Sequence, residues 1–395
     1  MLAQRTTLFN SLDAPAVSKA DQLRATGEEI IDLSVEEICS DLSPVVRDGA
    51  IAAIDHNLNR YTGTIGVRKL RHALARKVSA ETAQPWSEDE IAVTNGARHA
   101  LLNVAMSILN PGDEVLIPAP HWTTFPTQVA LAGGRPILLE TRHNNYVPQL
   151  TDLATAITSK TKAIVVNTPN NPTGAVYDRD TLADIAQLAI ERDLWIIFDE
   201  SYKAFTYAPH AHQPIVSVAP QARDRTLIVN SFSSSLALSG WRIGYLAGPK
   251  TVISAVKALQ SIMTTNVNII AQHALLYYLE RGDLYFQMQL ERQVATARAL
   301  GLSILSNLAL VPRPPAEGGI YFYLDLTELR RKANAKGREI DADDVANTLL
   351  MKARVSAASG TVFGDPAGIR LSYGIDLAQL SEGLRRLTEI LNTWS

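Results

Sequence analysis

The stretch SFSSSLALSGWRIGY, residues 231–245, begins at the end of an apolar run, RTLIVNSF, that is typical of a β-strand. Ser231 and Ser233 offer hydroxyl groups directly after this strand, and Arg242 offers a planar guanidinium that suits a phosphate dianion. Ser234 stands in the middle of three consecutive serines. The stretch therefore predicts an anion-binding loop that follows a strand.

Short apolar runs alternate with longer amphipathic ones on the N-terminal side of this loop. The pattern predicts strands at 90–95, 113–118, 135–140, 161–167, 194–200 and 225–232. It predicts helices at 97–109, 123–132, 150–157 and 179–193, with Thr151 as the N-cap of the third. Such alternation is typical of an α/β fold with a mostly parallel sheet covered on both faces. Ligands bind beyond the carboxyl ends of the strands in these sheets, so residues that follow strands are the candidates for a site.

The pattern changes after about residue 282. A long helix is expected at 284–308, a strand at 318–326, a helical stretch at 341–352 and another strand at 368–374. We therefore expect a large domain over residues 46–285, and a smaller α+β domain formed by residues 1–45 and 286–395.

Composition excludes several classes of protein. The 395 residues carry a formal net charge of −3, with no Lys/Arg run that would favour nucleic acid. No apolar run approaches the roughly 20 residues of a membrane span, and the N-terminus lacks the apolar core of a secretory signal. The single cysteine, Cys39, allows no intrachain disulfide and fits a reducing cytosol. We expect a cytoplasmic protein that binds neither nucleic acid nor membranes.

Two groups of candidate residues follow the earlier strands. Gly96, Ala97 and Arg98 lie where a strand enters a helix, and free backbone N–H groups at a helix N-terminus suit a phosphate. A plain strand-to-helix turn is the alternative. Trp122 follows the next strand and can stack on a heteroaromatic ring, or else serve as a core tryptophan.

Later strands end in further polar residues. Asn171 lies in NTPNNPTGAVY (167–177), where prolines and asparagines favour a rigid turn that points an amide into the cleft. Asp199 in FDESY ends an apolar strand, and a cationic ring nitrogen would be a suitable partner for it. Tyr202 could offer its phenol to the same ligand. Arg370 in GIRLSYG could clamp a carboxylate. The alternatives are a structural turn, a salt-bridged strand end and a solvated arginine.

The order and spacing of NNPTG, DESY and SFSxSLALSGWRIGY resemble those of the fold-type I aminotransferases of class I/II, which depend on pyridoxal 5′-phosphate (PLP). The branch that includes aspartate and aromatic aminotransferases is the most similar. The resemblance runs from RYTGTIGVRKLRHALA (60–75) to GIRLSYG (368–374). It implies PLP as cofactor and ping-pong transamination between an α-amino acid and a 2-oxo acid. It also implies a seven-stranded, mostly parallel sheet and a homodimer with shared active sites, working in amino acid metabolism.

The resemblance also implies a role for each candidate residue. Trp122 matches the residue that stacks on the pyridine ring, and Asp199 matches the carboxylate that keeps the ring nitrogen protonated. Asn171 and Tyr202 match the donors to the phenolate oxygen, and Arg370 matches the clamp for the substrate α-carboxylate. The residues that match phosphate ligands are Gly96, Ala97, Arg98, Ser231, Ser233, Arg242 and, from the partner subunit, Tyr61.

One departure from the family lies in DLSVEEICSDLSP (32–44). Glu36 takes the place of the glycine in the family's GEP-like turn, and Ile38 takes the place of the proline. Glu36 then either enters the substrate pocket, where it can pair with a basic or hydroxylated side chain, or points to solvent. The substrate is expected to contact Arg370, Glu36, Asn171 and Trp122.

The second departure is Ser234, which takes the position of the Schiff-base lysine. A serine cannot form an imine, and the loss of general acid–base catalysis alone costs roughly 10²–10⁴ in rate. Either a natural protein has abandoned transamination, or an engineered lysine-to-serine substitution traps the substrate–PLP adduct, the external aldimine. The accessory residues are all retained, which favours the second explanation. We expect the chain as written to be inactive or impaired.

Two other functions remain open. The same scaffold supports PLP-dependent elimination, replacement, cyclisation and oxidation of amino acids, and Glu36 favours this class. A non-catalytic protein that binds PLP or an amino acid is the other alternative. The usual DNA-binding partner of such a regulator is not expected, because the cofactor domain begins too near the first residue for a helix-turn-helix domain to precede it.

Overall fold

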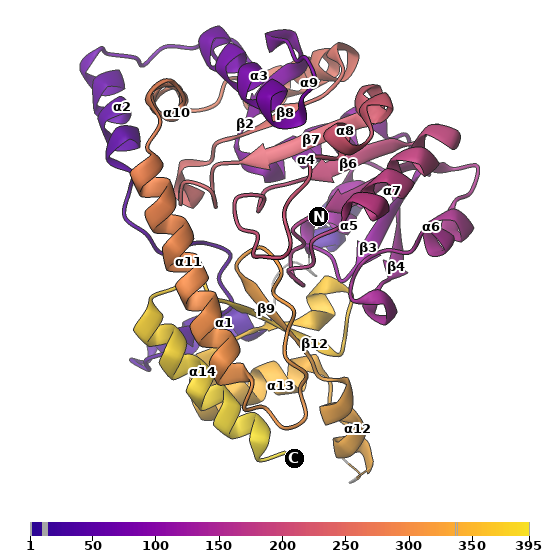
Figure 1. Ribbon diagram of the computed structural model, residues 1–395, viewed down its shortest axis with the longest axis vertical. Coiled ribbons are helices and arrows are strands. Elements are labelled where there is room, and N and C mark those ends of the chain that lie inside the picture. Colours follow the sequence, from indigo (N-terminus) through magenta and orange to yellow (C-terminus); the bar gives the residue numbers. More distant parts are fainter. Residues whose placement is uncertain (1, 10–14, 336, 338, 395) are drawn as a thin grey trace.

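The computed structural model describes residues 2–9, 15–335, 337 and 339–394. A seven-stranded sheet forms the centre of its larger part (Figure 1). In spatial order its strands are β2 (Ile91–Thr94), β8 (Gly244–Ala247), β7 (Thr226–Ser231), β6 (Trp195–Asp199), β5 (Thr161–Asn167), β3 (Glu114–Ala119) and β4 (Arg135–Glu140). All neighbours are parallel except β8, which is antiparallel to both β2 and β7. The expected α/β class with a mostly parallel sheet is confirmed.

The strands are apolar on both sides because helices cover both faces of the sheet. Val165 and Ile197 pack into one cluster with residues of α4 (Gly96–Ile108), α5 (Thr124–Leu131) and α9 (Lys250–Met263). Their neighbours Ile164 and Ile196 point to the opposite face, since successive side chains of a strand alternate. The helices that contribute to that second cluster include α3 (Arg68–Thr82) and α7 (Arg179–Glu191).

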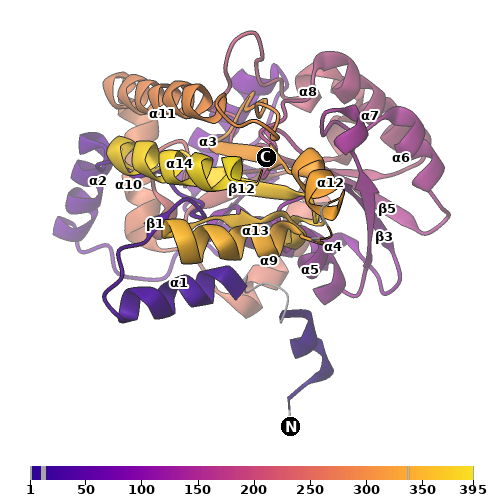
Figure 2. The same ribbon diagram turned by 90° about the horizontal axis from the view of Figure 1, so that it is seen from below.

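A smaller three-stranded antiparallel sheet has the order β11 (Ala358–Ser359), β12 (Gly368–Ser372), β9 (Tyr321–Asp325). Seen from below, α11 lies beside α14, and α1 lies beside α13 (Figure 2). The helices of this part are α1 (Pro15–Ala25), α11 (Leu284–Leu305), α12 (Thr327–Ala335), α13 (Ala342–Thr348) and α14 (Leu377–Asn392). β1 (Ile31–Asp32) pairs with β10 (Val355–Ser356), so the N-terminal segment joins this part. The division at residues 46–285 stays a prediction.

Several elements had no counterpart among the expectations from sequence. These are the strands β1, β8, β10 and β11 and the helices α1, α2 (Pro44–Asp55), α3, α8 (Ile215–Val218), α9, α10 (Ile269–Arg281), α12 and α14. The short turns of 3₁₀-helix are Gln4–Phe9, Glu88–Glu90, Arg142–Asn144, Pro220–Arg225, Ser239–Trp241 and Gly360–Phe363. In the described part of the chain, no helix is long and apolar enough to cross a membrane.

One detail of the expected helices is wrong. Thr151 is not an N-cap, because α6 (Leu150–Ala156) already begins one residue earlier with Gln149 at its cap. The helical stretch expected at 341–352 consists of α13 followed by a π-helical turn, Leu349–Ala353.

The stretch 231–245 connects two neighbouring antiparallel strands, β7 and β8. Its end is packed tightly against the start of α4. A Cβ atom on Gly244 would lie 2.7 Å from the Asn230 carbonyl oxygen and 3.0 Å from the Ala97 nitrogen, so only glycine fits there. The loop after β7 and the N-terminus of α4 are therefore fixed next to each other.

Candidate active site

A cavity of about 410 Å³ opens where the chain leaves β5, β6 and β7, beside the N-terminus of α4. Most of the site residues predicted from the sequence line this cavity, namely Glu36, Ala97, Arg98, Trp122, Asn171, Asp199, Tyr202, Ser231, Ser233, Ser234 and Arg242. Gly96, Arg370 and Tyr61 do not. Three lining residues were missed, Asn167, Ser201 and Ser239. Asn167 and Ser201 stand at strand ends, the same signal that nominated their neighbours.

Gly96 begins α4 with a φ of +77°, a conformation that favours glycine. A Cβ atom there would lie 2.6 Å from Nη2 of Arg242. The Arg242 guanidinium donates from Nη1 to the Ser239 carbonyl oxygen at 2.7 Å and from Nη2 to the Asn95 carbonyl oxygen at 3.4 Å. Gly96 thus gives Arg242 room to lie over the start of the helix.

Positive charge gathers at this end of the cavity. Loss of water around Arg242 and repulsion from Arg98 both lower the pKa of the Arg242 guanidinium. Among the described residues, no Asp or Glu forms an ion pair with either arginine. Two arginines, two serine hydroxyls and a helix N-terminus form a site that fits a phosphate.

Asp199 and Glu200 are adjacent buried carboxylates with opposite surroundings. Oδ1 of Asp199 accepts hydrogen bonds from the Ser201 backbone N–H at 3.0 Å and hydroxyl at 2.6 Å, and burial raises the pKa of Asp199 to about 6. Burial acts on Glu200 too, but Lys203 and His212 outweigh it and lower the pKa of Glu200 to about 2. In the described part of the chain, Asp199 has no cationic partner, which fits a protonated ring nitrogen of a ligand.

Arg370 lies on β12 and is 2% exposed. Its Nη1 donates to Oε1 of Glu36 at 2.5 Å and to Oδ1 of Asn171 at 2.9 Å, while Nη2 donates to the Ser34 carbonyl oxygen at 2.7 Å. Glu36 also accepts from Nε1 of Trp122 at 3.3 Å and from Nδ2 of Asn171 at 3.4 Å. Of the two interpretations of Glu36, the geometry favours the one in which it enters the cavity.

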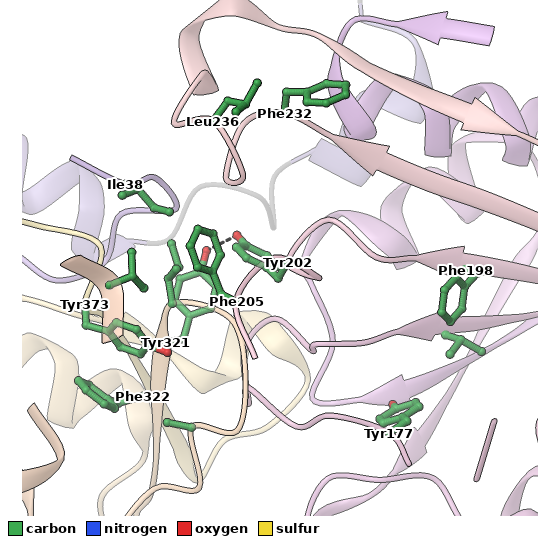
Figure 3. Packing of buried hydrophobic residues seen from close by; sticks show 14 of the residues in the cluster. Ile38, Tyr177, Phe198, Tyr202, Phe205, Phe232, Leu236, Tyr321, Phe322 and Tyr373 are labelled. Carbon is green, nitrogen blue, oxygen red and sulfur yellow. Dashed lines mark hydrogen bonds between the residues drawn. The ribbon is translucent and has the colours of Figure 1, made fainter. Parts of the chain in front are cut away.

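Tyr202 joins the two parts of the molecule. Its hydroxyl lies 2.6 Å from the hydroxyl of Tyr321 on β9, and the two rings meet edge to face (Figure 3). Burial raises the pKa of both phenols well above their ordinary value, with a smaller opposing effect of Arg370. Both hydroxyls therefore remain protonated at neutral pH and can donate hydrogen bonds.

Ser234 lies in the cavity wall and is 6% exposed. Among the described lining residues there is neither a lysine nor a histidine. Lys203 lies along a different cavity, of about 520 Å³, where it contacts Glu200 at 2.5 Å and Glu81 at 2.9 Å. Burial opposes its charge, but these carboxylates outweigh burial and raise the pKa of Lys203, so its amine is not a free nucleophile.

Tyr61 lies apart from the cavity and is 86% exposed. It precedes α3, in a region where α2 presents Ile51 and Ile54, 49% and 59% exposed. In the single chain, Tyr61 does not reach the site to which the sequence assigned it.

Comparison with known proteins identifies the family. Residues 28–387 match the family model described as aminotransferase class I and II. The chain is 33% identical over 376 residues to the probable aspartate/prephenate aminotransferase of Aquifex aeolicus, and the alignment covers 95% of this chain and 94% of that protein. It is 36% identical over 372 residues to the corresponding protein of Rhizobium leguminosarum, with 93% of each chain covered. The Thermus thermophilus aspartate aminotransferase with maleate superposes with a TM-score of 0.90, at 33% identity, over 99% of both chains.

The cavity fits the cofactor of this family. PLP carries a phosphate, for which Arg98 and Arg242 lie without carboxylate partners among the described residues. It also carries a pyridine nitrogen, for which Asp199 offers a buried carboxylate without a cation in the described chain. The chain belongs to the class I and II aminotransferases, a PLP-dependent family with this α/β fold.

Proposed function

We propose that this chain binds PLP together with an α-amino acid, and that Ser234 keeps it from completing transamination between that amino acid and a 2-oxo acid. The observation that carries the proposal is a cavity with its accessory groups in place but, among its described lining residues, no lysine or histidine. The lysine-to-serine interpretation and the impaired activity are part of this proposal.

Different residues of the cavity would contact different parts of the cofactor. Bound PLP supplies a carbonyl carbon that reacts with amino groups and a ring that withdraws electrons from the substrate. Asp199 would pair with the ring nitrogen, and Trp122 would lie against the ring face. Asn171 and Tyr202 would donate to the ring oxygen. The residues that would hold the phosphate are Gly96, Ala97, Arg98, Ser231, Ser233 and Arg242.

Among the described residues that line the cavity, none is suited to move a proton at the substrate Cα. Tyr202 keeps its own proton because burial raises its pKa. Burial disfavours the charge of Glu36, but Arg370 and two hydrogen-bond donors outweigh it and keep the pKa of Glu36 low, so it carries no proton to give at neutral pH. The hydroxyl of Ser234 is a poor base near neutral pH. The chain therefore keeps the residues that would bind and orient the substrate, but not those that would turn it over.

Replacement Ser234→Lys tests the proposal. The variant and the parent chain, both with added PLP, are incubated with a panel of amino acids and 2-oxo acids, and products are identified by mass spectrometry. We expect a rate increase of at least about 10²–10⁴, the usual contribution of a positioned acid–base group. Ser235→Lys is the matched control, because Ser235 lines the cavity of about 520 Å³ that contains Lys203 and does not line the cavity of Ser234.

The products of the Ser234→Lys variant decide between the candidate reactions. A 2-oxo acid together with the aminated cofactor supports transamination. Ring-closed, eliminated or oxidised products would replace it with the second class of PLP chemistry, which the carboxylate of Glu36 inside the cavity favours. If no amino acid is turned over although the parent binds amino acids reversibly, the chain is a binding protein.

We also propose that two copies pair so that Tyr61 of one reaches the phosphate end of the other. The support is the 86% exposure of Tyr61, with the exposed Ile51 and Ile54 on α2 nearby in sequence. Sedimentation of the purified chain should give a dimer at micromolar concentration; a monomer that binds PLP tightly would count against this assignment.

A further inference from the structure

We propose that Glu36 makes the cavity selective for amino acids with a positively charged side chain. Without substrate, the Glu36 carboxylate is paired with Arg370. The α-carboxylate of the incoming amino acid replaces it there, and Glu36 then pairs with the cationic side chain of that amino acid. The inference rests on the proposed binding of an α-amino acid at Arg370.

Glu36 stands between the cavity and Arg370. Glu36 lines the cavity, and its side chain is 35% exposed, whereas Arg370 is 2% exposed and does not line it. Arg370 belongs to the middle strand of the three-stranded sheet, while Glu36 belongs to a segment without helix or strand, residues 33–43. An amino acid can therefore reach Arg370 only after Glu36 has moved aside, and Glu36 is the partner with freedom to move.

The contact that Glu36 makes with Arg370 leaves room for exchange. Only Nη1 donates to Glu36, Nη2 donates to the Ser34 carbonyl oxygen, and the buried Nε has no hydrogen-bond partner among the described residues. A free carboxylate can accept two N–H groups of one guanidinium, a geometry stronger and more specific than a single contact. The substrate α-carboxylate is thus able to replace Glu36.

The displaced carboxylate then needs a new partner. Its other contacts, Nε1 of Trp122 and Nδ2 of Asn171, are neutral donors. Tyr202 is uncharged, and Arg98 and Arg242 are engaged by the phosphate once PLP is bound. A carboxylate in a partly desolvated cavity is costly unless it is paired.

The side chain of the amino acid decides how this charge is balanced. A basic side chain supplies the missing cation, a neutral one leaves Glu36 unpaired, and an acidic one brings a second negative charge beside it. The order of affinity that follows is basic, then neutral, then acidic. Glu36 is therefore the residue that determines which side chains the cavity prefers.

Binding to the parent chain with saturating PLP tests this order without any substitution. Isothermal titration calorimetry compares arginine with citrulline, lysine with norleucine, and then glutamate. Each of the first two pairs differs mainly in the charge of the side chain. We expect each basic member to bind about tenfold tighter than its neutral partner or better, the scale of a desolvated charge pair, and glutamate to bind weakest.

Glu36→Gln keeps the size of the side chain and removes its charge. In this variant the ratio between arginine and citrulline should fall to within about threefold, and citrulline should bind more tightly than to the parent, because a charged group no longer occupies Arg370. Glu29→Gln is the control, an exposed glutamate seven positions before Glu36 that does not line the cavity. It should leave every ratio as in the parent, and thermal unfolding checks that both variants are folded.

Equal affinities for arginine and citrulline in the parent would overturn the inference, and so would a preference that survives in Glu36→Gln. In both cases amino acids still bind, and the proposed function stands. Failure of every amino acid to bind a PLP-loaded chain would overturn both proposals. If Glu36→Gln does not fold, the matched pairs on the parent chain decide alone.

Discussion

The two ends of the cavity treat charge in opposite ways. At the end formed by α4 and the loop after β7, Arg98, Arg242 and Asp199 have no partner of opposite charge among the described residues. At the end formed by β12 and the N-terminal segment, Arg370 is already paired with Glu36. The charges of the first end lack partners that a ligand can supply. At the second end, the carboxylate of Glu36 takes the place that a ligand carboxylate would occupy on Arg370.

This difference teaches what each end does in the absence of ligand. An unpaired buried charge such as Asp199 costs stability and is relieved when the ligand binds. A paired charge such as Arg370 costs less than an unpaired one, but the ligand must then compete with the internal partner. The cofactor end should therefore gain from binding, and the substrate end should select among ligands.

The largest expected effect comes from breaking the paired end. Arg370→Leu should weaken the binding of arginine to the PLP-loaded chain by about 300-fold or more, since loss of one member of a buried charged pair costs about 2–5 kcal/mol. The affinity for PLP should change little, because Arg370 does not line the cavity. Titration calorimetry measures both affinities. Loss of PLP binding with normal amino acid binding would reverse the assignment of the two ends.

A smaller effect is expected at Asp199 in the cofactor-free chain. Its folded pKa, about 6, lies above the ordinary value of 3.8, so between these values the folded state holds a proton that the unfolded state has lost. The free energy of unfolding should therefore fall as pH rises through this window, by about 3 kcal/mol in all. Asp199→Asn should not show this fall.

Denaturant unfolding at several pH values between 4 and 7 measures the difference between the parent and Asp199→Asn. Asp41→Asn, at an exposed position outside the cavity, controls for the change in net charge. Saturating PLP should flatten the parent's profile, since a protonated ring nitrogen would pair with Asp199. Parallel pH profiles for the parent and Asp199→Asn would contradict the unpaired carboxylate.

The smallest of the three effects is expected at Arg242. Arg242→Gln should weaken PLP binding by about 30-fold, near 2 kcal/mol, the contribution of a hydrogen bond to a charged group. It should leave the affinity of the PLP-saturated chain for arginine unchanged. Absorbance titration with PLP measures the first, and calorimetry the second. Equal losses at both ends would erase the distinction between them.

The cofactor end could be predicted from the sequence because its geometry follows from the sheet. Asn171, Asp199 and Ser231 each come at or just after the end of a strand, and the carboxyl ends of parallel strands meet at one edge. Even the missed residues Asn167 and Ser201 stand at the same strand ends. Local order along the chain was enough to place them together.

The substrate end could not be predicted in the same way. Arg370 and Glu36 are 334 positions apart, and Glu36 lies in a segment without regular structure, so no periodicity brings them together. For this reason the sequence alone could not decide whether Glu36 enters the pocket or points to solvent. Likewise, nothing in DESY separates Asp199, which faces the cavity, from Glu200, whose partners Lys203 and His212 come from the chain beyond it.

Arg370 lies on the central strand of its sheet and Glu36 on a loop over it, and this arrangement affects the rate of amino acid binding. β12 is bonded on both sides, to β9 and β11, so the arginine stays where it is while the loop opens. Because Glu36 must move aside first, the observed rate of amino acid binding should level off at high concentration, at the rate at which Glu36 leaves Arg370. Stopped-flow measurements would then time the loop itself, and a rate that stays proportional to concentration would show that no such step precedes binding.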